Sequence, residues 1–181
     1  MRSSPTFELR YSPNGKCAEK LVEVISATKS KIRAMVFSAT LDEVSEALIK
    51  AKNRGVDVQV VLDRKQTKGD QAKFHDKLEA VGVEIRLYSP GWRSYMHHKV
   101  GIFDGKVVTT GSFNWTKNAE RNNNENLITM ESPEIAEAYA KIFDELWKVA
   151  SPEARFRRVR RFGRFVLSFI PVSARYYPAN Q

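Results

Sequence analysis

Cysteine is almost absent from this chain of 181 residues, and long apolar runs are missing. Cys17 is the single cysteine, which excludes an intrachain disulfide and a zinc site built from cysteines. No stretch approaches the ~18 apolar residues that cross a bilayer, and no apolar segment follows Arg2 as it would in a signal peptide. The localisation is therefore left open between the cytoplasm, which the sequence as written indicates, and export by way of a trimmed leader.

Acidic residues are outnumbered, and the imbalance is uneven along the chain. Lysine and arginine total 30 against 21 aspartate and glutamate, a net charge of +9. Residues 152–181 hold seven arginines and one acidic residue, Glu153, and so carry +6 of this charge. A strongly basic segment favours polyanionic partners, either nucleic acid or an anionic membrane.

The basic segment also has a helical pattern. Over residues 154–170 apolar side chains recur every three or four positions with arginines between them: Phe156, Val159, Phe162, Phe165 or Val166, and Phe169. A basic amphipathic helix of this kind can lie on an anionic membrane, hold nucleic acid or dock on a partner chain, and all three roles stay open. We divide the chain into a domain at 1–150 and a basic amphipathic tail at 151–181.

Strand and helix patterns alternate along the first half of the domain. Strands are expected at 7–11, 32–37, 58–62 and 83–88, and helices at 17–27, 41–53 and 70–80. After a polar loop at 116–124, a strand is expected at 127–130 and a helix at 135–149, capped by Ser132. Short links between such elements predict an α/β sandwich, with a mixed, largely parallel sheet flanked by helices.

A loop at 89–95 interrupts the alternation and is rich in aromatic and basic side chains. Trp92, Arg93 and Tyr95 could form the wall of a nucleic-acid groove, because aromatic rings stack on bases and arginine binds phosphates. The alternative is a surface loop whose aromatic side chains cover the core. Both interpretations are open.

A hairpin is predicted directly after this loop. Asp104-Gly105 separates two β-branched runs, 99–103 and 106–110, and is a strong signal for a tight turn. Because side chains alternate along a strand, His97 and Lys99 should project from the same face.

Small and polar residues follow the second strand of this hairpin. Gly111 permits close approach of the backbone to a ligand, and Ser112 and Asn114 supply neutral hydrogen-bond donors. Together with His97 and Lys99 they form a plausible cradle for an anionic tetrahedral group.

The spacing of these residues resembles the signature of the phospholipase D superfamily, which is His-x-Lys, four residues, Asp, six residues, Gly-Ser-x-Asn. Every position is matched: His97, Lys99, Asp104, Gly111, Ser112 and Asn114. A looser resemblance covers about residues 5–149. It is closest to the branch with one motif per chain, which includes a bacterial DNA/RNA endonuclease and mitochondrial phospholipase D-like proteins.

The resemblance implies a phosphodiesterase that uses no metal and no cofactor. His97 would attack phosphorus and form a phosphohistidine, a second histidine would protonate the leaving oxygen, and water would resolve the intermediate. Lys99, Ser112 and Asn114 would bind the phosphate, and Glu125 would orient the imidazole. The resemblance also places Asp104 in the catalytic set, while Asp-Gly turn chemistry gives it a structural alternative.

The second histidine is hard to find within one chain. His98 should point away from its neighbour on a strand, and His75 lies on a predicted helix. The economical solution is His97 of the partner subunit, because a twofold axis places one patch against its own copy. We therefore expect an obligate homodimer with one composite site.

The positive charge and the aromatic-basic loop favour nucleic acid, either DNA or RNA, as the substrate. We therefore expect the chain to be an endonuclease. The first alternative is a phospholipase D-type hydrolase of anionic phospholipids, with the tail as membrane anchor. The second is a non-catalytic nucleic-acid-binding dimer, for which His97 would not be required.

Overall fold

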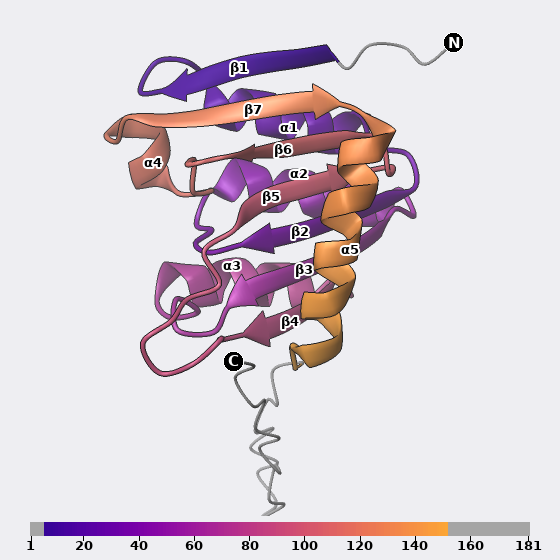
Figure 1. The fold of residues 1–181 in the computed structure, drawn as a ribbon. Coiled ribbons are helices and arrows are strands. Elements are labelled where there is room, and N and C mark those ends of the chain that lie inside the picture. Colours follow the sequence, from indigo (N-terminus) through magenta and orange to yellow (C-terminus); the bar gives the residue numbers. More distant parts are fainter. Residues whose placement is uncertain (1–5, 152–181) are drawn as a thin grey trace, which may run out of the picture.

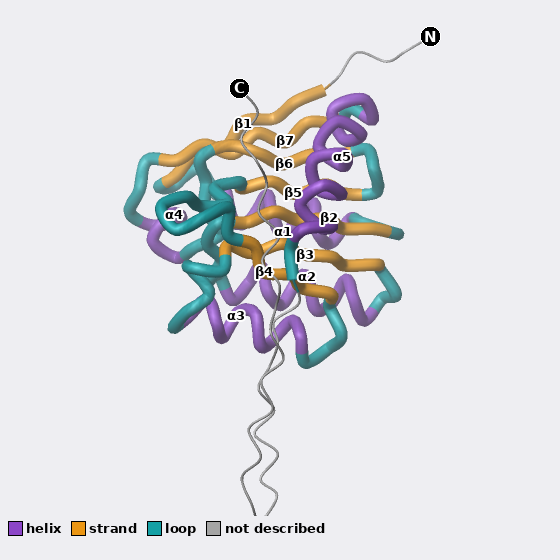
Figure 2. The backbone as a smooth tube through the Cα atoms, turned by 60° about the horizontal axis from the view of Figure 1, so that its bottom comes forward, coloured by secondary structure: helices purple, strands orange, loops and turns teal. Residues whose placement is uncertain are grey.

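The computed structural model describes residues 6–151, which form a seven-stranded mixed sheet between helices (Figures 1 and 2). The strands are β1 (Thr6–Ser12), β2 (Lys31–Val36), β3 (Asp57–Asp63), β4 (Glu84–Tyr88), β5 (Lys99–Phe103), β6 (Val107–Gly111) and β7 (Glu125–Glu131). The helices are α1 (Cys17–Ala27), α2 (Asp42–Asn53), α3 (Asp70–Glu79), α4 (Lys117–Arg121) and α5 (Pro133–Val149). The expectation of an amphipathic helix at 154–170 lies outside the described residues.

The sheet has the strand order β1-β7-β6-β5-β2-β3-β4. β3 pairs in parallel with β2 and with β4, whereas the other four pairings are antiparallel. The α/β class and the mixed sheet are confirmed, but the expectation of a largely parallel sheet is wrong. Only the first half of the chain has the helical crossovers that parallel pairs need, and the hairpin after β4 adds antiparallel strands.

Two helical layers cover the sheet. Figure 1 shows α1, α2 and α3 behind the sheet and α5 in front of it. Each rear helix buries a leucine completely in one core cluster: Leu21, Leu48 and Leu78. α5 packs its Phe143 into a second cluster on the other face, together with Met35 of β2 and Val100 of β5. These two cores fix the sheet, and the sheet fixes the positions where its strands end.

Two local predictions differ from the structure. The polar segment expected as a loop contains the short helix α4, which begins where the Thr116 hydroxyl accepts a hydrogen bond from Ala119 N at 3.1 Å. His97 and His98 precede β5 rather than lying in it, so the alternation rule does not apply to them.

Between residues 6 and 151, no helix has the length and apolarity that a membrane crossing requires.

Candidate active site

β2, β3 and β4 end at the same side of the sheet at which β5 and β7 begin (Figure 1). His97 lies at this side, two residues before β5. Phe37 directly follows β2, and its backbone N–H donates to the carbonyl of His98 at 2.7 Å. The rings of Phe37 and His97 are tilted against each other, with centroids 4.4 Å apart. The end of β2 therefore supports the segment that carries the imidazole.

The structure brings Lys99 and His97 together, as the sequence predicts. Lys99 Nζ lies 3.0 Å from Nδ1, 3.1 Å from Nε2 and 2.9 Å from the backbone carbonyl oxygen of His97. The ammonium also lies 4.9 Å from the centre of the Phe37 ring. Only 6% of Lys99 is exposed, so its positive charge is held at one place beside the imidazole.

The pKa values of His97 and Lys99 are both lowered, and the shift of His97 is in the direction that nucleophilic attack requires. Burial, assisted by the charge of Lys99, lowers the pKa of His97, and Asp63 opposes the shift. Burial lowers the pKa of Lys99 to about 8, against the opposing charge of Glu125. At pH 7 the imidazole is therefore largely neutral and keeps a lone pair, while about nine in ten Lys99 side chains remain charged.

The Gly-Ser turn at the end of β6 is built by contact with β7. A Cβ atom on Gly111 would lie 2.2 Å from the carbonyl oxygen of Asn126, and Gly111 has φ +146°. The same carbonyl accepts from the backbone N–H of Ser112 and of Phe113, both at 3.1 Å, and the Ser112 hydroxyl accepts from Asn126 N at 3.1 Å. Glycine is required here because the two strands approach so closely.

Asn114 follows in a segment that is fastened to the end of β2. Trp115 N donates to the Ser38 carbonyl at 3.0 Å, and the Trp115 carbonyl accepts from the N–H groups of Thr40 and Leu41. The Asn114 side-chain oxygen Oδ1 is buried, and no residue among 6–151 donates a hydrogen bond to it. An unpaired buried amide oxygen is a position where a hydrogen-bond donor fits, whereas an anion would be bound by the amide N–H groups of the same side chain.

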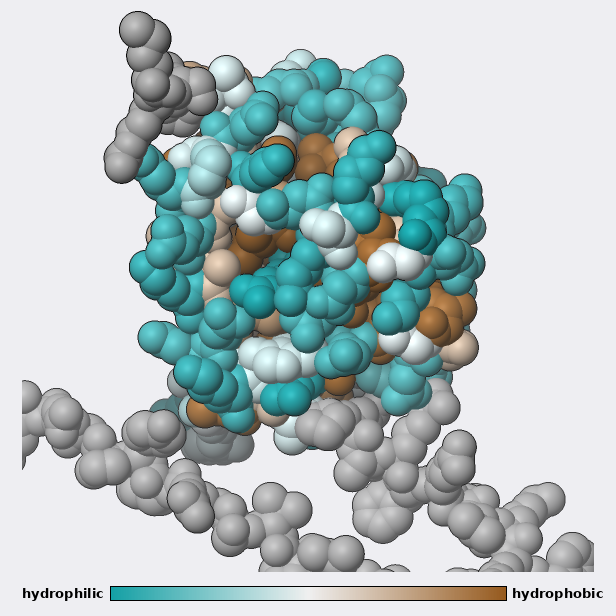
Figure 3. Space-filling model, turned by 90° about the vertical axis from the view of Figure 1, so that its right-hand side faces the viewer, coloured by the Kyte–Doolittle hydropathy of each residue, from teal (hydrophilic) through white to brown (hydrophobic). Residues whose placement is uncertain are grey.

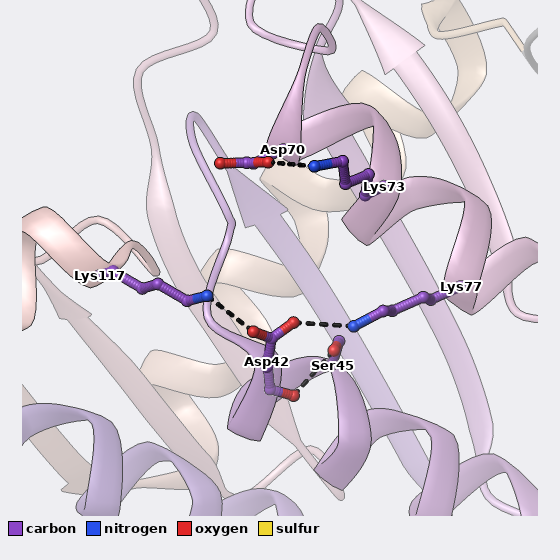
Figure 4. Close-up of polar contacts among 6 residues, drawn as sticks. All are labelled: Asp42, Ser45, Asp70, Lys73, Lys77 and Lys117. Carbon is purple, nitrogen blue, oxygen red and sulfur yellow. Dashed lines mark hydrogen bonds and ion pairs between the residues drawn. The ribbon is translucent and has the colours of Figure 1, made fainter.

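Ion pairs hold the following helix in place. Figure 4 shows Asp42, at the start of α2, between Lys77 of α3 and Lys117 of α4, each at 2.7 Å. Hydrogen bonds from Lys117 and Lys77 lower the pKa of Asp42 to about 2. These contacts tie α4, and with it the segment of Asn114, to the rear helices.

The resemblance implies that Glu125 orients the imidazole and places Asp104 in the catalytic set, and the structure gives both side chains other hydrogen-bond partners. Glu125 begins β7, and its side chain accepts a hydrogen bond from Asn123 at 3.0 Å. Among residues 6–151, no hydrogen bond joins Glu125 to the His97 ring. Its influence on the site is the charge that acts on Lys99. Asp104 lies in the β5–β6 turn, at the end of β5 remote from Lys99, and accepts four hydrogen bonds from residues 29–31. This place contradicts direct catalysis by Asp104 and agrees with the structural alternative.

Of the residues predicted to form the wall of a groove, Tyr95 packs next to the site. Trp92 is 84% exposed, with the Arg93 guanidinium carbon 4.7 Å from its ring centre. Tyr95 is 52% exposed and packs edge-on against Phe37, with centroids 5.7 Å apart. Since Phe37 also contacts His97, the loop and the imidazole share one support.

Sequence reasoning gave Asp63 no role, although it ends a buried strand. Asp63 is fully buried, and its Oδ2 accepts from the backbone N–H of Met96 at 2.8 Å. Its Oδ1 accepts from the N–H groups of Lys65 and Gln66. A carboxylate after an apolar run is the signal that could have indicated this role. It fixes the residue directly before His97.

The other histidines lie elsewhere. His75 is buried on α3 beside Asp76, and His98 is half-buried, with its pKa lowered by burial and by the charges of Lys99 and His97. In the described part of the chain, no hydrogen bond joins either to His97.

The opposite edge of the sheet offers less chemistry. It is covered mainly by hydrophilic side chains, with smaller apolar areas between them (Figure 3). A hollow of about 460 Å³ between β1 and α1 includes Asp104 in its lining and therefore lies away from His97. Its Lys20 is already paired with Glu8 and Glu23, so this hollow does not compete with the His97 site as a candidate centre.

Comparison with known proteins agrees with this geometry. A family described as "Cardiolipin synthase, PLD-like domain" matches residues 21–147. The mitochondrial cardiolipin hydrolase of Chlamydomonas reinhardtii is 30% identical over 137 residues, which are 76% of this chain and 60% of that protein. A phospholipase D of Rickettsia bellii is 34% identical over 130 residues, 71% of this chain and 63% of that protein. The chain thus spans about three fifths of the length of these curated relatives.

Two of the similar solved structures are matched over almost their whole length. Nuc of Salmonella typhimurium, a phospholipase D family member, has a TM-score of 0.78 and 32% identity, covering 82% of this chain and 98% of that one. NucT of Helicobacter pylori has a TM-score of 0.75 and 22% identity, covering 82% and 99%, and shows the shared fold. The chain belongs to the phospholipase D superfamily of phosphodiesterases.

Proposed function

We propose that the chain is an endonuclease that hydrolyses phosphodiester bonds of DNA or RNA without a metal, through a phosphohistidine at His97. The observation that carries the chemistry is the nearly buried Lys99 ammonium within 3.1 Å of both ring nitrogens of His97. A phosphate bound at this ammonium would place its phosphorus within reach of the imidazole. Lys99, Asn114 and Ser112 would hold the non-bridging oxygens and so stabilise the charge that develops in the transition state.

The two steps balance as follows. A ring nitrogen of neutral His97 forms a bond to phosphorus, and the bond from phosphorus to the leaving oxygen breaks. The leaving oxygen takes a proton from a second histidine in its imidazolium form, which becomes a neutral imidazole. Water then forms a bond to phosphorus and gives its proton to that imidazole, while the phosphorus–nitrogen bond breaks. The lowered pKa of His97 supports this sequence because it favours the neutral nucleophile.

The second imidazole is the partner's His97 in a homodimer. His75 lies on α3 beside Asp76 and His98 is the direct neighbour of His97 in the chain, whereas a twofold axis would bring a second copy of His97 to the first. Wild-type chains mixed and reassembled with inactive His97→Ala chains test this arrangement. With equal amounts, a composite site predicts about one quarter of the undiluted activity, and independent sites predict about one half. A linear dependence on the wild-type fraction would refute the composite site.

Nucleic acid is preferred to lipid because of the surface beside the site. Trp92 and Arg93 present an exposed indole with an adjacent guanidinium, and the chain carries a net charge of +9. Aromatic rings with basic neighbours are the groups that bind bases and phosphates.

A substrate panel in the presence of EDTA tests the proposal: single-stranded DNA, duplex DNA, RNA and cardiolipin vesicles. Cleavage of nucleic acid is expected, and it should disappear in His97→Ala. His98→Gln is a matched control, since it removes the adjacent imidazole and should retain activity. Turnover of lipid alone would reject the nuclease assignment in favour of the phospholipase.

The phospholipase alternative has its own support. Several relatives are named cardiolipin hydrolase or phospholipase D, and their substrates share the phosphodiester group. A row of exposed apolar side chains on β1, namely Phe7, Leu9 and Tyr11, would suit contact with lipid. The non-catalytic alternative has less support, because binding alone does not call for His97 with a lowered pKa beside Lys99.

A further inference from the structure

Lys65, in the β3–α3 connection, makes contacts that the reaction at His97 does not use. Its Nζ donates to the backbone carbonyls of Gly91 at 2.6 Å, Trp92 at 2.6 Å and Ser94 at 2.7 Å. An ammonium has three protons, so these three carbonyls satisfy it completely. Lysine on a protein surface normally keeps its charged end in water, whereas this one crosslinks a neighbouring loop.

The segment that Lys65 holds is a tight turn with a fixed position relative to the site. The Gly91 carbonyl also accepts from Ser94 N at 3.4 Å, and the two residues form an isolated β-bridge. The Tyr95 ring centre lies 4.8 Å from Lys65 Nζ, and the same ring packs on Phe37. Met96, which ends the segment, is held by buried Asp63. Both ends of the turn are therefore attached to the end of β3.

At the tip of this rigid turn stands Trp92, 84% exposed. A large indole in water contributes nothing to the core, so a turn that is fastened to present it has a use outside the fold. Arg93 lies over the ring at 4.7 Å, and the other neighbours are glycine and serine rather than aliphatic residues. This chemistry suits stacking on a base and contact with a phosphate. Bases in a duplex are already stacked on each other, so an unpaired base is the one that fits.

We propose that Lys65 is a positioning residue, which pre-shapes the 91–95 turn so that Trp92 receives an unpaired base of single-stranded nucleic acid cleaved at His97. The inference rests on the proposed function and names its substrate class. Ordering a flexible turn on binding would cost affinity, and Lys65 removes this cost by ordering the turn beforehand. Lys65 acts through Trp92 and has no part in bond breaking.

The test compares Lys65→Met, Trp92→Ala, the double variant and Lys65→Arg with wild type at one salt concentration, because binding of nucleic acid depends on salt. Lys50→Met, an exposed lysine of α2, is the control for loss of charge. Three quantities are measured: the Kd for labelled oligothymidylate by anisotropy, kcat and KM for its cleavage, and turnover of bis(p-nitrophenyl) phosphate, which has no base to stack.

Trp92→Ala and Lys65→Met should each raise Kd and KM about tenfold, with kcat and turnover of the small substrate unchanged. The double variant should be no worse than Trp92→Ala, since one residue acts through the other. Lys65→Arg, which keeps donors for the carbonyls, should recover most of the affinity.

Three results would overturn the inference. They are additive effects in the double variant, equal losses in Lys50→Met and Lys65→Met, and weakened binding to cardiolipin vesicles with unchanged binding to oligothymidylate. Should Lys65→Met not fold, acrylamide quenching of tryptophan fluorescence in the wild type decides: oligothymidylate must protect Trp92, and duplex of equal length must not. If wild type turns over neither substrate, the proposed function fails, while the binding results still decide the role of Lys65.

Discussion

Removing the charge of Asp104 should weaken the fold and leave the chemistry intact. The carboxylate accepts from the backbone N–H groups of Lys29, Ser30 and Lys31 at 2.8–2.9 Å and from the Ser30 hydroxyl at 2.7 Å. These bonds tie the β5–β6 turn to the connection between α1 and β2. Asp104→Asn keeps the shape of the side chain but replaces one acceptor oxygen with a donor and removes the charge.

The magnitude follows from the pKa. Burial acts to raise the pKa of Asp104, but hydrogen bonds from Lys29, Lys31 and Ser30 outweigh it and lower the pKa to about 2. Relative to the usual value of ~3.9, this corresponds to ~2.5 kcal/mol at most. Solvent screening at this partly exposed group reduces the expected loss to about 1–2 kcal/mol. Because the folded-state pKa is depressed, the stabilisation is present above about pH 4 and is lost as the pH falls towards 2.

The assay is urea unfolding followed by circular dichroism at pH 7 and at pH 3. We expect Asp104→Asn to lower the free energy of unfolding at pH 7 and to differ less from wild type at pH 3. Asp57→Asn is the matched control, since Asp57 forms a largely exposed ion pair with Lys31 at 3.0 Å and should cost less than about 1 kcal/mol. A loss of kcat of about 100-fold or more at unchanged stability would refute the reasoning, because only a direct catalytic role produces it.

Three further predictions concern other parts of the chain. Substrate KM should rise above about pH 8, measured in a pH series, because the Lys99 ammonium loses its charge there; a flat profile to pH 10 would show that this charge is not needed for binding. Gly111→Ala should destabilise the fold by about 1–3 kcal/mol in thermal unfolding, since its Cβ would lie 2.2 Å from the Asn126 carbonyl oxygen; an unchanged Tm would contradict the close approach. Cys17, whose pKa burial raises to about 11, should react with a thiol reagent in urea but hardly in the folded protein; rapid labelling without urea would show that the thiol is accessible.

Much of the fold was predictable because its elements carry local signals. α1 begins and ends at the predicted residues, Cys17 and Ala27, and the β5–β6 turn lies at the predicted Asp104-Gly105. The balance of parallel and antiparallel pairs was not predictable, because strand order depends on contacts between distant strands. α4 was missed because four polar residues and one alanine give no hydrophobic period, and because the ion pair of Lys117 is made with Asp42, which is distant in the sequence.

The candidate site was also predictable only in part. The His-x-Lys spacing of the signature placed His97 and Lys99 in one site, although the strand alternation first used for this prediction does not apply, because His97 precedes β5. Asp63 and Lys65 form hydrogen bonds with residues about 30 positions away in the sequence, and no local sequence pattern predicts such contacts. The hydrogen bond of Glu125 to Asn123 likewise depends on how the chain turns before β7.

β2 pairs in parallel with β3 on one side and antiparallel with β5 on the other, so the parallel and antiparallel parts of the sheet join at β2. His97 lies near the end of β2, directly beside this junction. β2, β3 and β4 end there and β5 begins there, so residues that are distant in the sequence meet at this end of the sheet. Insertions in the loops at this end of the sheet would change the surroundings of the site, while the pairing of β2 with β3 and β5 stays the same. Proteins that share this architecture can therefore bind different classes of substrate and still catalyse the same reaction.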